Sequence, residues 1–167
     1  THFKIIYEVC NKLIDTKSFL EKYGAMIMKD DLYLGYYLHL IQDAVYRRFL
    51  YTDEGFINKR NGNYVSELHN DYALLNEYII NKYGLEIIDN TINIDCIDEI
   101  YDFKYNELLD ELKLDFSNRG TGTTIHLTED MMDRFIEKSF GICCEELEAL
   151  KGKNSKFNYL CYSWSRA

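Results

Sequence analysis

Apolar side chains recur three and four positions apart along most of this chain, a spacing typical of amphipathic α-helices. The first such segment, residues 3–15, has Ile5, Ile6, Val9 and Leu13 at helical spacing. The same spacing predicts further helices at residues 17–28, 31–51, 71–83, 95–113 and 129–150. The chain contains no proline, which removes one large class of helix breakers. The pattern therefore predicts an all-α fold, a single-domain bundle of about six helices.

Polar and glycine residues mark the ends of these segments. Asp30 or Asp31 can cap the start of the third segment, because an aspartate accepts from the unpaired backbone N–H groups there. Gly84 follows the fourth segment, and Thr128 can cap the last one. Loops are predicted where the apolar spacing is lost, at residues 52–65 and 117–124.

The length of the chain, 167 residues, is enough for one domain with its own core. We therefore predict one helical domain over residues 1–167. The chain begins without an initiator methionine, so we expect a fragment that lacks upstream residues. The tail, residues 152–167, is weakly patterned and is expected to be docked or flexible. Its aromatic residues favour docking, because a free tail would leave them in water.

Composition and charge restrict the classes of partner. The net charge is -9 and the pI is ≈ 4.9, so we expect no attraction to nucleic acid or to anionic lipid. No stretch of the sequence has the length of a membrane span, and no signal peptide is visible. The five cysteines include no CxxC pair, which argues against a disulfide framework or a cysteine zinc site. A reducing compartment, the cytoplasm, is therefore expected.

The third helical segment carries an imidazole and a carboxylate one helical turn apart, His39 and Asp43. A helical projection places them opposite a stripe that includes Leu34 and Leu38, and both faces are apolar or aromatic. The pair is therefore predicted to be partly withdrawn from water, where an ionised carboxylate requires a partner. Three arrangements could compensate the Asp43 carboxylate. They are a structural hydrogen bond to His39 that is extended by Arg47, a catalytic dyad with His39 as general base, or a metal ion bound by both side chains.

Two motifs of the chain are similar to those of a known family. The chain opens with Thr1-His2-Phe3, and the run from Gly35 through His39 to Asp43 has the pattern G-x-x-x-H-x-x-x-D. Together they resemble the bacterial zinc-dependent phospholipase C family, in which a THF-type histidine precedes a helix with this pattern. The similarity extends to small uncharacterised relatives from low-GC Gram-positive bacteria, which share a segment like residues 71–76. It covers residues 1–83.

The resemblance implies a metal-dependent hydrolase. In it, His2, His39 and Asp43 hold one zinc ion or another divalent metal, and a water on that ion attacks a small phosphoester. Three protein ligands leave one position open, which suits catalysis. Family members take a further ligand from an upstream aspartate, and their full cluster uses a histidine where this chain has Phe49 and a later His-x-x-x-Glu that is missing here. The resemblance therefore implies one ion and not a trinuclear cluster.

His69 and Asp71, at the predicted start of the fourth helix, have two interpretations. In the first interpretation, one of the two is an additional metal ligand or a general base. In the second, Asn70 or Asp71 caps the start of the helix. The cap is the simpler interpretation. His126 lies in a loop before the last helix, and we assign it no role.

A function from a different class also agrees with the sequence. It is a non-catalytic helical structural or interaction protein that keeps the fold, and the missing outer ligands favour it. The acidic residues Glu107, Asp110 and Glu111 are predicted to form no more than a solvated helix edge.

Overall fold

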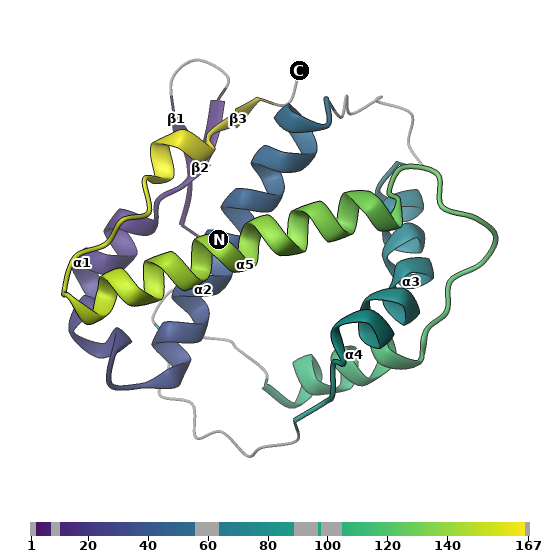
Figure 1. Ribbon diagram of the computed structural model, residues 1–167, viewed down its shortest axis with the longest axis horizontal. Helices are drawn as coiled ribbons and strands as arrows, with labels where there is room; N and C mark the ends of the chain where they lie inside the picture. The colour runs from purple at the N-terminus through teal and green to yellow at the C-terminus, as the bar shows by residue number, and fades with distance from the viewer. Residues whose placement is uncertain (1–2, 8–10, 56–63, 89–96, 98–104, 166–167) are drawn as a thin grey trace. The chain divides into compact units, whose positions relative to one another are not determined.

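The structure is a computed structural model that describes residues 3–7, 11–55, 64–88, 97 and 105–165 (Figure 1). Over these residues the chain is mostly helical, as the apolar spacing predicted. The helices are α1 (Thr16–Ile27), α2 (Asp31–Arg48), α3 (Tyr64–Tyr83), α4 (Tyr105–Ser117) and α5 (Glu129–Lys151), with a π-helical turn η1 (Phe49–Asp53) and a 3₁₀ turn η3 (Tyr159–Tyr162). Three short strands are β1 (Lys4–Tyr7), β2 (Asn11–Ile14) and β3 (Trp164–Ser165).

The chain divides into two compact units. One, here called the terminal unit, comprises residues 1–58 and 134–167, and the other, the central unit, comprises residues 59–133. The terminal unit therefore joins both ends of the sequence, whereas the central unit is one continuous segment. The boundary between them falls within α5, after its first turn.

A three-stranded antiparallel sheet occupies the start of the terminal unit, where the spacing predicted a helix at residues 3–15 (Figure 1). In β1 and β2, Lys4 lies opposite Ile14, and in β2 and β3, Lys12 lies opposite Trp164. The helix prediction is wrong here because the third strand comes from the other end of the chain. Trp164 is 1% exposed and Leu13 is fully buried, so the sheet contributes to the core.

Helix α2 supplies the centre of the terminal unit's core. Its buried residues are Tyr33, Tyr37, Leu40, Ile41, Ala44 and Val45. The stripe that the helical projection runs from Leu34 and Leu38 to Ile41 and Val45 is buried only in its second half, because Leu34 and Leu38 are partly exposed. The buried face is instead the one that meets α1, where Phe19 stacks on Tyr37 with 5.9 Å between ring centroids. Aromatic packing between two helices, which no single-helix projection includes, decides which face is buried.

The tail is bound to the terminal unit by a buried carboxylate. Glu146 on α5 is 1% exposed, and its Oε2 accepts the backbone N–H groups of Lys156 at 2.7 Å and Phe157 at 2.8 Å. Its Oε1 accepts the Tyr37 hydroxyl of α2 at 2.8 Å. Burial raises the pKa of Tyr37 above its ordinary value, and the carboxylate adds to the rise. Together with β3, these bonds dock the tail on the body of the unit.

Candidate functional site

His39 and Asp43 lie one turn apart on the regular helix α2 of the terminal unit. Asp43 is partly exposed, as predicted, but the His39 side chain is exposed, so the prediction that it is partly withdrawn from water is wrong. The physical reason is the rotation of the buried face described above, which turns this pair away from the core. Tyr36 lies beside the imidazole, with 6.0 Å between the ring centroids. Water and a dissolved ion can therefore reach both groups.

A row of aromatic rings connects this pair to the N-terminal segment. Phe3 packs edge-on against Phe19 of α1 at 5.4 Å, and Phe19 packs against Tyr36 at 5.5 Å. The Phe3 carbonyl accepts the backbone N–H of Asp15 at 2.8 Å. Phe3 also has a φ of 47°, a left-handed conformation that is uncommon for a residue with a bulky side chain. The packing and the hydrogen bond hold this residue in a costly conformation beside α1.

His2 lies outside the described residues, so the predicted ligand set of His2, His39 and Asp43 stays a prediction. Within the described ranges, no three His, Cys, Asp or Glu side chains are grouped closely enough to hold a metal ion.

Comparison with known proteins gives no family for this chain: no protein-family model matches it, and no curated protein or solved structure matches it significantly. The similarity to zinc-dependent phospholipase C therefore stays a prediction. None of the helices that the structure describes has both the length and the apolarity required to cross a bilayer.

Asp71 is a fully buried carboxylate in the central unit. Its Oδ1 accepts the backbone N–H of Ile125 at 2.9 Å, and its Oδ2 accepts those of His126 at 2.6 Å and Leu127 at 2.9 Å. The prediction that it caps its own helix is wrong, because α3 already begins at Tyr64. Asp71 instead binds the loop that leads into α5. Its alternative role as a ligand or general base stays a prediction.

The loop before α5 is attached to α3 at two further points. The Asn70 side-chain amide pairs with the backbone of Thr121, donating to its carbonyl at 2.9 Å and accepting its N–H at 3.1 Å. At Gly120, with φ of 61°, an added β-carbon would lie 2.7 Å from the Leu74 side chain and 2.8 Å from its backbone nitrogen. Only glycine allows so close an approach. The loop predicted at residues 117–124 is therefore present between α4 and α5, and it is packed on α3.

His126, to which we assigned no role, forms a contact with Glu67 on α3. Its Nε2 lies 2.9 Å from Oε2 of Glu67, and the side chains are 20% and 37% exposed. Glu67 and Asp71 are four residues apart, so both project from the same side of α3. One of them holds the backbone of His126 and the other holds its ring. The four-residue spacing of Glu67 and Asp71 is visible in the sequence, but nothing in the sequence indicates that both acids contact His126.

His69, the other candidate of the fourth segment, lines a cavity between α3 and α4. The cavity has a volume of about 680 Å³. Its polar lining includes His69, Tyr72 and Asn76 from α3 and Glu111 and Asp115 from α4. The Asn76 side-chain amide donates to the Asp115 backbone carbonyl at 2.8 Å and so links the two helices. Sequence reasoning missed this cavity, because it depends on how α4 packs against α3.

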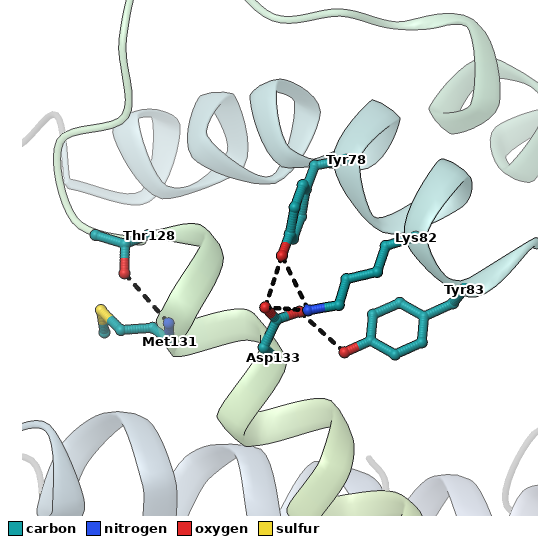
Figure 2. A network of polar contacts seen from close by, with 6 residues as sticks. All are labelled: Tyr78, Lys82, Tyr83, Thr128, Met131 and Asp133. Atoms are coloured by element: carbon teal, nitrogen blue, oxygen red, sulfur yellow. Dashed lines mark hydrogen bonds and ion pairs between the residues drawn. The ribbon is translucent and has the colours of Figure 1, made fainter.

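Asp133, in the first turns of α5, accepts three donors from the end of α3 (Figure 2). They are the hydroxyl of Tyr78 at 2.6 Å, the hydroxyl of Tyr83 at 2.9 Å and the ammonium of Lys82. Lys82 lowers the pKa of the Asp133 carboxyl, and the Tyr78 hydroxyl lowers it further. In return, Asp133 raises the pKa of Tyr78. These shifts favour an ionised acid and a protonated phenol, so the cluster is a structural contact and not an activated nucleophile.

The Asp133 cluster predicts an acid-dependent part of the stability. A carboxyl whose pKa is lower in the folded than in the unfolded state stabilises the fold above its unfolded pKa, near 3.9. This contribution is lost as the pH falls through the lower folded pKa. We expect the midpoint of urea denaturation to fall less steeply below pH ~4 in Asp133→Asn than in the unaltered protein. Asp110→Asn, an exposed change on α4, serves as control. Parallel curves for Asp133→Asn and the unaltered protein would contradict the expectation.

Proposed function

We propose that this protein is a metal-dependent hydrolase that acts on small phosphoesters, with one zinc ion held by His2, His39 and Asp43. One observation carries the proposal. An exposed imidazole and a partly exposed carboxylate lie one turn apart on α2, at the end of the aromatic row that begins at Phe3. Phe3, which follows the proposed ligand His2 in the sequence, is held at the other end of that row.

The donor set fits the ion. Imidazole nitrogen and carboxylate oxygen are ordinary zinc ligands, and side chains four residues apart on a helix have β-carbons about 6 Å apart. The exposure of His39 and Asp43 leaves room for a further ligand and for a substrate. A bound zinc ion supplies a Lewis acid that polarises a phosphoryl oxygen and makes water a better nucleophile.

Residues around the pair orient it. The Tyr36 ring beside His39 limits the directions that the imidazole can take. Tyr36 is itself packed against Phe19, which anchors Phe3 in turn. The same row of rings therefore supports the side chain of His39 and the backbone of Phe3, the residue that follows His2 in the sequence. Such support keeps metal ligands in position and reduces the entropy lost on binding.

A non-catalytic interaction protein is the second candidate. Exposed large apolar side chains favour it, and examples are Phe140 on α5, which is 69% exposed, and Leu114 on α4, which is 61% exposed. Apolar groups left in water at such positions are typical of surfaces that bind other molecules when they form a continuous patch.

Zinc binding separates the two candidates. Protein stripped with chelator and titrated with zinc should bind about one ion per chain, and His39→Ala and Asp43→Ala should each weaken binding by more than about tenfold. Asp110→Ala is the matched control for Asp43→Ala, because it removes an exposed carboxylate that belongs to no proposed ligand set. Less than about 0.2 zinc per chain, unchanged in His39→Ala, would favour the interaction protein.

The hydrolase part of the proposal has its own measurement. The zinc-loaded protein should hydrolyse a chromogenic phosphodiester, and His2→Ala, His39→Ala and Asp43→Ala should each abolish that activity. Zinc bound at full occupancy without any turnover would contradict the hydrolase but leave the metal site standing.

A further inference from the structure

We propose that the cavity between α3 and α4 of the central unit binds a small organic cation with an alkyl body, a polyamine or a similar alkyl diamine. The proposal does not depend on the metal site. It starts from the size of the cavity, about 680 Å³, which lies in the range that small-molecule sites occupy. A space of this size is larger than a bare metal ion requires, and it suits a ligand with several attachment points.

The charge of the lining points to a cation. Glu111 and Asp115 are exposed, lie one turn apart on α4, and both line the cavity. Neither carboxylate has a hydrogen bond or an ion pair with another residue in the described part of the chain. The nearby guanidinium of Arg119 is directed to Glu77, at 3.5 Å, and to backbone carbonyls. Two ammonium groups separated by a short alkyl chain would match two carboxylates about 6 Å apart at their β-carbons.

The remaining lining suits the alkyl body of such a ligand. Ala73, Leu75 and Met132 form a buried apolar part of the wall, with exposures of 6%, 4% and 7%. Tyr72 contributes an aromatic ring, whose face attracts an ammonium or a methylene next to one. Asn76 is fixed by its bond to the Asp115 backbone and so keeps the two helices together across the cavity. A metal ion or an inorganic cation would leave this apolar wall unused.

The overall charge agrees with this ligand class. The chain has a net charge of -9, so an organic cation is attracted to it. Long-range attraction alone gives no specificity, because salt screens it over about 10 Å. The specific part must come from the carboxylates and the apolar wall of the cavity, and the experiment isolates that part.

The test is calorimetric titration of the full chain with spermidine and with putrescine at an ionic strength of about 0.15 M. Glu111→Gln and Asp115→Asn should each weaken binding by about tenfold, because each removes one charge-assisted contact. The matched control is Asp110→Asn, which removes an exposed charge from the same helix but lies outside the cavity lining; it should change binding by less than about twofold. Equal weakening by all three changes would show counterion attraction only and would overturn the proposal.

Two further measurements locate the ligand and test its alkyl body. Spermidine should slow backbone hydrogen exchange in residues 69–79 and 111–118 more than elsewhere in the chain. Magnesium at the same ionic strength should bind at least about tenfold more weakly than spermidine, because it cannot use the apolar wall. Binding by magnesium as tight as by spermidine, uniform protection, or no binding of either amine would each overturn the proposal.

Discussion

Replacing Asp71 with asparagine should lower the free energy of unfolding by about 3 to 5 kcal/mol. The carboxylate is fully buried and accepts three backbone N–H groups of the loop before α5. Asparagine has nearly the same shape but only one acceptor oxygen, and its NH₂ group would face N–H donors. Each buried donor left without a partner costs about 1 to 3 kcal/mol. Urea denaturation followed by circular dichroism measures the change.

The matched control for Asp71→Asn is Asp110→Asn, the same chemical change at an exposed position on α4. We expect it to alter the free energy of unfolding by less than about 0.5 kcal/mol. Hydrogen exchange adds a local measurement, since the amides of residues 125–127 should exchange faster in Asp71→Asn under native conditions. A loss of stability below about 1 kcal/mol, with these amides still protected, would mean that the three hydrogen bonds contribute little.

Three helix ends could be predicted because they depend on neighbouring residues, whereas the start of α3 lies at Tyr64 and not at residue 71. Asp30 caps α2 by accepting the Leu32 N–H at 2.9 Å, and Thr128 caps α5 by accepting the Met131 N–H at 3.2 Å (Figure 2). Gly84 has a φ of 60° directly after α3, the conformation expected after a helix end. Each of these features is decided within about four residues, so the printed sequence contains all the information required.

Features that depend on distant segments were missed. Residues 3–15 were predicted as a helix, but β2 pairs with β3, whose Trp164 comes from the other end of the chain. The adjacent Ile5 and Ile6 also suit a strand, since β-branched residues favour an extended backbone. The face that α2 buries was likewise decided by α1, through Phe19. Local periodicity alone could not distinguish these cases.

The sequence predicted that His39 and Asp43 lie one turn apart on a helix, but it did not predict the surroundings of the pair. The spacing of His39 and Asp43 on one helix followed from the sequence, and the structure has them on α2. Their exposure did not follow, because it depends on the packing of α1. The cavity beside His69 was beyond prediction for the same reason, since it needs the position of α4 against α3.

Within the described part of the chain, the two buried carboxylates, Asp71 and Glu146, could have been recognised from their positions in the apolar pattern. Asp71 stands three residues after Leu68 and four before Leu75, and these leucines are buried. Glu146 stands three residues after Cys143 and seven after Ser139, which are buried too. An acid that interrupts a buried stripe at helical spacing can be recognised as an anchor, because burial of its charge requires several donors. What the sequence does not reveal is which segment supplies them.

Replacing Glu146 with glutamine should lower the free energy of unfolding by about 2 to 4 kcal/mol and release the tail. Glutamine can keep one acceptor oxygen, but its NH₂ group would then face either the Tyr37 hydroxyl or the N–H groups of Lys156 and Phe157. Trp164 is the only tryptophan of the chain and is buried in β3, so it reports on the tail directly. Its fluorescence should shift to longer wavelength in Glu146→Gln at urea concentrations where the helices remain folded.

A graded series distinguishes loss of the tail bonds from a general effect of charge. Glu145→Gln removes the same charge from the adjacent, exposed position and should leave both stability and Trp164 emission unchanged. Tyr37→Phe keeps the ring in the core but removes one donor to Glu146, and should cost about 1 kcal/mol without releasing the tail. If Glu146→Gln and Glu145→Gln gave the same small change, the tail would be held by β3 and the burial of Trp164 alone.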